Sequence, residues 1–252
     1  MTEQFDPQRT PEAAIERLVP AGAGWVARIR CSVRSDGDFR CDRAAGSSLD
    51  HHGRLERRRR TLMDGSWTWL EQVHGTGVVV VTEPGGAAGS VADGAVTAVP
   101  GAVLAVHTAD CAPVVVVGNG AVGVAHAGWR GIVAGVLGEV VQALRSLTPG
   151  SGRSSLRAVV GPVIRPSAYE FGPAELDAVA GAARRDVRSV TSWGAPALDL
   201  VVAVRGALST AGVGDVEDLG FDTAQDCFFS HRVRGECSRQ ATTVRLERLE
   251  DP

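Results

Sequence analysis

The 252-residue sequence contains no lysine, so all 26 of its basic residues are arginine. This absence excludes a lysine Schiff base, a pyridoxal-phosphate lysine and the lysine of a phosphate-binding P-loop. A phosphate or carboxylate ligand must therefore be held by arginine side chains, backbone N–H groups or a metal ion. Heavy use of alanine, glycine and valine accompanies this bias and is also what GC-rich coding produces.

Long apolar runs are also missing. Segments such as Val114–Val117 are far shorter than the about 20 residues that a membrane helix needs. A net charge of −3 provides no positive field for nucleic acid. Glu3 and Asp6 precede any apolar segment, which is unlike a signal peptide, so a cytoplasmic location is expected. The basic run of Arg54 and Arg57–Arg60 favours a solvated helix face or loop over a phosphate or RNA site.

The sequence has few cysteines, and they are not arranged in pairs. Their number is odd, and no C-x-x-C spacing occurs among them, which argues against a disulfide scaffold and a structural zinc ribbon. Free thiols fit a reducing cytosol. The five are Cys31, Cys41, Cys111, Cys227 and Cys237.

Apolar periodicity predicts the fold class. Residues 1–24 are polar and interrupted by proline and glycine, which predicts a partly ordered lead-in, and residues 25–252 are expected to form a single catalytic domain. Asn119-Gly120 predicts a hairpin that brings the neighbourhoods of Cys111 and His126 together. Helical spacing predicts one helix over about 130–147. The expected class is α/β (α+β), with mixed β-sheets covered by helices.

The remaining elements follow from the same patterns. Residues 33–66 are interpreted as a long loop with one short helix near 54–63, and Asp199 as the N-cap of a late helix. The other expected elements are strands at Trp25–Ser32, Trp67–Val73, Val78–Thr82, Val103–Thr108, Pro113–Val117, Val122–Ala125, Leu156–Val160, Val216–Leu219 and Thr242–Leu246, and helices at Pro173–Arg185 and Leu200–Ala211.

Three residues carry the chemistry. His74, Cys111 and His126 each lie in a segment marked by glycine, proline or aspartate. Two imidazoles and one thiolate suit a borderline-soft divalent cation, and three protein ligands leave one coordination position open. Each residue taken alone also fits an ordinary structural role: His74 as a turn histidine, Cys111 as a buried thiol and His126 as a core histidine. Together they favour an enzyme with an open metal site.

These motifs resemble a known family. His107–Cys111, followed by His126–Gly131, is similar to the laccase-domain family, which was first labelled multicopper polyphenol oxidase and later described as zinc-dependent purine nucleoside phosphorylases with adenosine deaminase activity. The resemblance extends in order over most of the chain. Further matching segments are Ala92–Ala95, Gly161-Pro162, Tyr169–Gly172, Leu198–Leu200, Phe228–Arg232 and Arg239–Ala241.

The resemblance implies an activity and its partners. Zinc would be held by His74, Cys111 and His126, which are also the expected catalytic residues, with copper as an alternative metal. The substrates would be a purine nucleoside (adenosine, inosine or methylthioadenosine) and phosphate, with deamination of adenosine to inosine. A zinc ion at such a site brings the pKa of a bound water toward neutrality. No nucleic acid or membrane partner is expected, and the oligomeric state is open.

Other polar residues are candidates for binding substrate. Arg130, at an expected helix start, is placed to bind phosphate or ribose oxygens. His231, Arg232 and Arg239 are expected to close the same pocket. Asp110 is assigned to the substrate site and interpreted as orienting an imidazole. Two further interpretations are that His107 lies in the core or behind the ligands, and that His51-His52 are exposed.

Three rival functions remain open. Cys111 and His126 also suit a metal-free cysteine hydrolase. A copper-dependent polyphenol oxidase is the second, and it is less plausible because a multicopper centre needs more histidines than the six present. A catalytically weak member that binds a nucleotide or a protein partner is the third. Departures from the family pattern favour this third possibility. No Ser-Leu-Asn-Leu-Gly segment is recognisable in 33–60, and the sequence has Arg165 in place of glycine, Asp222 in place of cysteine and Ser238 in place of glycine.

Overall fold

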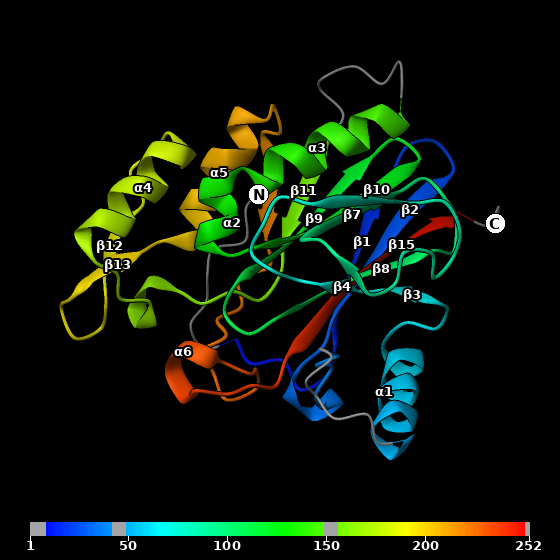
Figure 1. Ribbon diagram of the computed structural model, residues 1–252, viewed down its shortest axis with the longest axis horizontal. Helices are drawn as coiled ribbons and strands as arrows, with labels where there is room; N and C mark the ends of the chain where they lie inside the picture. Colours follow the sequence, from blue (N-terminus) through cyan, green and yellow to red (C-terminus); the bar gives the residue numbers. More distant parts are fainter. Residues whose placement is uncertain (1–8, 42–48, 149–155, 250–252) are drawn as a thin grey trace.

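Two β-sheets pack face to face, and helices cover the outer face of each (Figure 1). The computed structural model describes residues 9–41, 49–148 and 156–249, with the side chains of 49–52 left out. One sheet has the order β1-β2-β15-β8-β3, and the other has the order β14-β11-β9-β10-β7-β5. Both contain parallel and antiparallel pairs. The expected α/β class with mixed sheets covered by helices is confirmed.

The element bounds are as follows. The strands of the two large sheets are β1 (Ile15–Pro20), β2 (Trp25–Cys31), β3 (Trp67–Thr68), β5 (Val78–Val81), β7 (Gly94–Thr97), β8 (Val103–Thr108), β9 (Ala112–Gly118), β10 (Ala121–Ala127), β11 (Arg157–Val160), β14 (Asp215–Asp218) and β15 (Gln240–Arg248). Two small sheets pair β4 (Leu70–Glu71) with β6 (Ser90–Val91) and β12 (Arg188–Val190) with β13 (Pro196–Leu198). The helices are α1 (Leu49–Leu62), α2 (Trp129–Ala134), α3 (Val136–Leu147), α4 (Pro173–Ala183), α5 (Leu200–Thr210) and α6 (His231–Arg234).

The four layers explain why the central strands are apolar throughout. On β9, Val114 and Val116 pack against α3 and α5, whereas Val115 and Val117 pack against the other sheet. Because successive side chains point to opposite faces, a strand covered on both faces reads as a continuous apolar run. On β8 the odd-numbered Val103 and Ala105 face the cluster beneath α1. His107 continues this odd-numbered side, as expected from the sequence.

Several expectations about the elements need correction. The single helix expected over 130–147 is two helices, because Gly135 adopts a left-handed conformation (φ 102°) that ends α2 and begins α3. The expected lead-in contains β1, whose six residues pair with β2 along their whole length. The helix expected near 54–63 begins earlier, at Leu49. Asp199 is the N-cap of α5, as expected, and accepts a bond from Val202 N.

Two departures from the family pattern lie side by side. Arg165 forms a two-armed ion pair with Asp218 at 2.7 and 2.8 Å, with both side chains about nine-tenths buried. Asp222 accepts a hydrogen bond from the Arg165 backbone N–H. The next residue, Thr223, donates to Asp110 beside the candidate ligand Cys111. Arg165 and Asp222 therefore stabilise the loop that holds Thr223 against Asp110, next to Cys111.

Arg165→Ala is expected to lower the free energy of unfolding by about 3–5 kcal/mol, because it leaves the buried Asp218 carboxylate without its partner. Urea denaturation measures this. The matched control is Arg157→Ala, since Arg157 pairs with Asp215 at the surface, with side chains 47% and 56% exposed. An exposed pair contributes only about 0–1 kcal/mol. Equal losses in the two variants would show that the Arg165 pair is energetically unimportant.

Candidate metal centre

His74, Cys111 and His126 come together in space. Their ligand atoms all lie within 4.8 Å of one another. The Cys111 Sγ atom is 3.7 Å from His74 Nε2, and the two imidazole rings have their centroids 4.7 Å apart. Within the described ranges no other group of three histidine, cysteine or acidic side chains does this. The grouping expected from the sequence is therefore present.

The three residues come from two neighbouring strands and a loop. His126 lies near the end of β10, and Cys111 immediately precedes β9, whose Ala112 pairs with Ala127. His74 lies in the loop that joins β4 to β5, with φ 58°. A positive φ is costly for a residue with a side chain, so the surrounding contacts must hold this loop in place.

Asp93 supplies those contacts. Its fully buried carboxylate accepts hydrogen bonds from the backbone N–H groups of Val73, His74 and Gly75 at 3.2, 3.0 and 2.7 Å. It also lies 2.8 Å from His126 Nδ1. One side chain thus fixes the His74 loop and orients the His126 ring, leaving Nε2 of His126 for a metal. Burial opposes ionisation, but these bonds hold the pKa of Asp93 below its usual value.

Sequence reasoning missed this role of Asp93 and gave it to Asp110. The Asp110 carboxylate instead accepts hydrogen bonds from Thr223 Oγ1, Ser230 Oγ and the backbone N–H of Arg232 at 2.8, 2.7 and 2.6 Å. In the structure these three hydrogen bonds tie Asp110 to the C-terminal loop, and the carboxylate that bonds an imidazole is Asp93. The only sequence signal for Asp93 was its place in the motif Ala92–Ala95.

Gly128 leaves space for the cluster. A Cβ atom at this position would lie 2.8 Å from Cδ2 of His74 and 2.9 Å from Sγ of Cys111. Both distances are shorter than real Cβ contacts, so a larger residue would push two candidate ligands away. Close packing beside the ligands thus explains why position 128 of the segment His126–Gly131 is a glycine.

The electrostatics of the cluster favour a thiolate. Burial opposes ionisation of Cys111, but the charge of His126 and hydrogen bonds to both imidazoles lower its pKa to about 6. Burial likewise opposes protonation of His126, whose pKa is nevertheless raised to about 9 by Cys111 and Asp93. The ionised thiol is the form that binds metal ions.

The cluster opens into a cavity of about 430 Å³, a volume typical of small-molecule sites. Three of the five residues expected to bind substrate, Arg130, His231 and Arg239, line it. Arg232 does not, because its guanidinium packs over the rings of Tyr169 and Phe171 at 4.8 and 5.1 Å. The full lining is Arg40, Cys41, Trp69, Leu70, Glu71, Gln72, His74, His107, Thr108, Ala109, Cys111, His126, Arg130, His231 and Arg239.

Arg40 and Cys41 show that the segment 33–60 contributes to this cavity even though the family's motif is not recognisable there. The rest of the loop, 42–48, lies outside the described residues, as do the side chains of His51 and His52, which were expected to be exposed.

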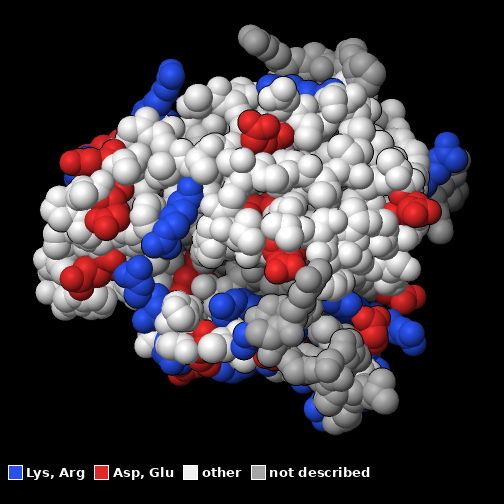
Figure 2. All heavy atoms as spheres, in the orientation of Figure 1, with Lys and Arg blue, Asp and Glu red and all other residues white. Residues whose placement is uncertain are grey.

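Figure 2 shows basic side chains gathered in the lower part of the molecule around α6, whereas the surface over α3 carries few charges.

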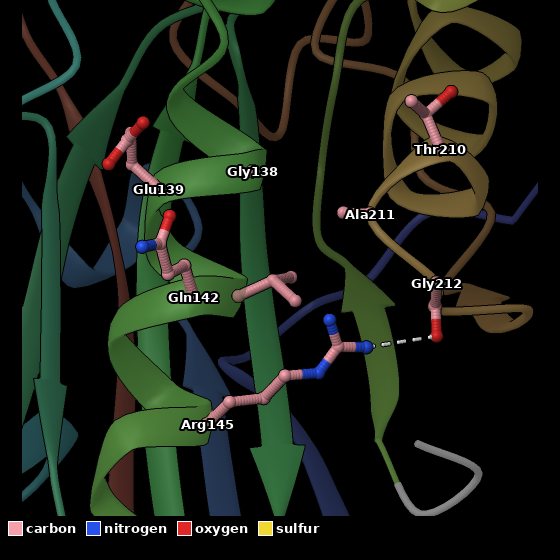
Figure 3. Close-up of a pocket in the computed structure, with 8 residues that line it drawn as sticks. Gly138, Glu139, Gln142, Arg145, Thr210, Ala211 and Gly212 are labelled. Carbon is pink, nitrogen blue, oxygen red and sulfur yellow. Dashed lines mark hydrogen bonds between the residues drawn. The ribbon is translucent and has the colours of Figure 1, made fainter.

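A second cavity, of about 510 Å³, lies between α3 and the end of α5 (Figure 3). Arg145 crosses it and donates to the carbonyl of Gly212 at 3.2 Å. It shares no lining residue with the metal cavity and contains no candidate ligand.

No helix in the described part of the chain combines the length and apolarity that a membrane crossing requires.

Known proteins resemble this chain along most of its length. Residues 35–247 match the family described as multi-copper polyphenol oxidoreductase laccase. A purine nucleoside phosphorylase of Streptomyces griseus is 40% identical over an alignment of 183 residues that covers 71% of this chain and 71% of that protein. Another of that name, from Xylella fastidiosa, is 41% identical over an alignment of 195 residues that covers 69% of this chain and 70% of that protein.

Solved structures agree with this relationship. A protein from Neisseria meningitidis superimposes with a TM-score of 0.77 at 27% identity, covering 94% of this chain and all of that one. YlmD from Geobacillus stearothermophilus gives a TM-score of 0.76 at 27% identity, covering 98% of this chain and 99% of that one.

Fold and site together define a two-sheet α/β protein with a cluster of two histidines and one cysteine at the ends of its central strands. The chain belongs to the multi-copper polyphenol oxidoreductase laccase family. Its relatives from Streptomyces griseus and Xylella fastidiosa bear the name purine nucleoside phosphorylase. The resemblance stated from the sequence motifs is thereby confirmed.

Proposed function

We propose that this protein is a zinc-dependent purine nucleoside phosphorylase that also deaminates adenosine. The observation that carries the proposal is the three-donor cluster at the wall of a cavity lined by Arg40, Arg130 and Arg239. The names of the relatives support the substrate class. A cytoplasmic location belongs to the proposal, and the five free cysteines support it.

The donor set fits zinc. Two imidazoles and one thiolate are ligands that zinc prefers, and copper is the alternative that the same donors permit. Gly128 leaves space beside the ligands, and the His126 Nδ1–H group donates a hydrogen bond to Asp93. These are the surroundings that a metal-binding imidazole and thiolate need. When bound, zinc supplies a Lewis acid with an open coordination position.

The chain's own residues bind and orient the reactants. In phosphorolysis a phosphate oxygen forms a bond to C1′ of the ribose while the bond from C1′ to the purine nitrogen breaks, and that nitrogen leaves with a proton. In deamination a water oxygen adds at C6 of adenine and ammonia leaves. Because the chain has no lysine, the arginines of the cavity are the side chains that hold phosphate against the ribose.

Product analysis tests this proposal. Metal-replete protein is incubated with inosine, adenosine or methylthioadenosine, with and without phosphate. We expect free purine base together with ribose 1-phosphate (5-methylthioribose 1-phosphate from methylthioadenosine) only when phosphate is present, and inosine from adenosine in either case. No turnover of any purine nucleoside would overturn the proposal.

A cysteine hydrolase is a second candidate, since the donor atoms of Cys111 and His126 lie within 4.8 Å of each other and their shifted pKa values favour a thiolate beside a protonated imidazole, as in nucleophilic cysteines. A chelator distinguishes the two functions. A hydrolase dyad keeps its activity after the metal is removed, whereas the proposed phosphorylase loses it and regains it with zinc.

Arg130→Ala is expected to raise the Michaelis constant for phosphate in base release by about ten- to hundred-fold, because one charge-assisted hydrogen bond to the anion is lost. Bound zinc, measured by mass spectrometry, should remain unchanged. Arg145→Ala is the matched control, since Arg145 lines the other cavity. Loss of zinc in Arg130→Ala would make Arg130 structural, and an unchanged Michaelis constant for phosphate would assign the anion to other arginines.

A further inference from the structure

His107 is a buried polar residue that the proposed chemistry does not use. It is 6% exposed and lines the metal cavity. Its Nδ1 atom lies 3.4 Å from Cys41 Sγ, but its Nε2 atom is buried without any hydrogen-bond partner. Leaving a buried polar atom unpaired typically costs about 1–3 kcal/mol. An unpaired ring nitrogen on a residue that lines a ligand cavity is therefore a position where a ligand atom is expected.

The backbone of His107 is held firmly in place. The side chain of Gln72 accepts a hydrogen bond from the His107 N–H at 2.7 Å and donates one to its carbonyl at 2.8 Å. Gln72 lies two residues before His74, so this pair of bonds ties the ligand loop to the end of β8. These bonds fix the His107 backbone relative to the metal cluster, and the contact of Nδ1 with Cys41 Sγ orients the ring.

Trp69, which also lines the cavity, is equally well supported. The guanidinium carbon of Arg59 lies 5.7 Å from its ring centroid and 5.6 Å from that of Trp67. A Cβ atom on Gly89 would lie 3.2 Å from the outer edge of the Trp69 ring. Arg59 is 8% exposed, so this member of the basic run is buried rather than solvated as expected. These contacts hold the indole as a rigid, half-buried platform.

We propose that Trp69 and His107 form the subsite that recognises the purine base, with the base stacked on the Trp69 indole and one of its polar edge atoms hydrogen bonded to His107 Nε2. The inference rests on the proposed function for the nature of the ligand. Stacking on an aromatic ring accepts any flat heterocycle, and the fixed imidazole nitrogen then selects for a polar edge. No role in this subsite is assigned to the three metal ligands.

The charge of this wall favours a base over the phosphate. Burial, together with the charges of Arg59, Arg239 and His126, lowers the pKa of His107 to about 3, so the imidazole is neutral at physiological pH. A neutral imidazole offers a hydrogen bond but no charge to an anion. The arginines of the cavity provide the alternative place for phosphate.

Equilibrium binding to zinc-loaded protein tests the subsite. Dissociation constants for hypoxanthine, inosine and inorganic phosphate are measured by calorimetry. Trp69→Ala is expected to raise those for hypoxanthine and inosine by about ten- to hundred-fold, and His107→Phe by about three- to ten-fold. His107→Gln, which keeps a polar end group, should restore part of the affinity. Zinc content and phosphate affinity should stay at wild-type values.

Trp193→Ala is the matched control, because this tryptophan is 59% exposed and lines a different groove. Unchanged affinity for base and nucleoside in both Trp69→Ala and His107→Phe would overturn the inference. A loss of phosphate affinity with base affinity intact would overturn it also, by making this wall the anion site. If wild-type protein binds hypoxanthine through these residues but turns over no nucleoside, the proposed function fails and the subsite stands.

Discussion

Cys111→Ala is expected to lose stoichiometric zinc and to lower kcat/KM for purine nucleosides by at least about a hundred-fold. The thiol is the one candidate ligand that becomes negatively charged, and its lowered pKa keeps it ionised at neutral pH. Loss of a group that merely supports a ligand already costs about 10–100-fold in metal affinity, so loss of the charged donor itself costs more. Mass spectrometry of the native protein and steady-state kinetics measure the two effects.

Cys237→Ala is the control for this substitution, because Cys237 is exposed and lies outside the cavity. It should keep both zinc and activity. If Cys111→Ala retained zinc at full occupancy while losing all activity, the thiol would act as a nucleophile and the hydrolase would be favoured. If it retained both, Cys111 would not be part of the site.

Asp93→Asn is expected to weaken zinc binding by about 10–100-fold. The carboxylate accepts from three consecutive N–H groups of the His74 loop and from His126. An amide cannot accept all four bonds, so both imidazoles lose their fixed orientation. Competition with a chromophoric chelator measures the affinity. Asp199→Asn is the control, since Asp199 accepts from Val202 N at the start of α5 and does not line the metal cavity. Equal zinc affinity in wild type and Asp93→Asn would contradict the assigned role.

The same carboxylate predicts a pH dependence of stability. The folded protein holds the pKa of Asp93 below its unfolded value of about 3.9. Its contribution to the free energy of unfolding is therefore complete above that unfolded value and is lost as the pH falls through the lower folded one. Asp93→Asn should flatten this acid limb in urea titrations of the metal-free protein. An identical acid limb in the variant would show that Asp93 is not the group responsible.

The sequence predicts the ligands better than what holds them. His74, Cys111 and His126 are recognisable because they occur together, in the order and local motifs of the family that the chain resembles, and Asn119-Gly120 correctly pairs the strands that place two of them. Asp93 could not be assigned in the same way, since three of its four hydrogen bonds depend on a loop that lies 18 to 20 residues away and the fourth depends on His126, 33 residues away. Three of those bonds are to backbone atoms, which leave no trace in the sequence.

The substrate residues and the helices show the same limit. Arg130, His231 and Arg239 reach the cavity, but Arg232 is drawn onto the aromatic rings of Tyr169 and Phe171. Neighbouring arginines cannot be told apart without knowing which rings lie beside them. The break of the helix at Gly135 is likewise set by a left-handed conformation that apolar periodicity does not register.

X-ray absorption at the zinc edge, on protein purified without added metal and then loaded with one equivalent of zinc, tests the proposed metal centre most directly. Zinc held by His74, Cys111 and His126 should show one sulfur at about 2.3 Å and two imidazole nitrogens at about 2.0–2.1 Å, with one further light atom in the open position. The sulfur signal should disappear in Cys111→Ala. A wild-type spectrum with no sulfur, or with more than one, would contradict the assignment of these three ligands.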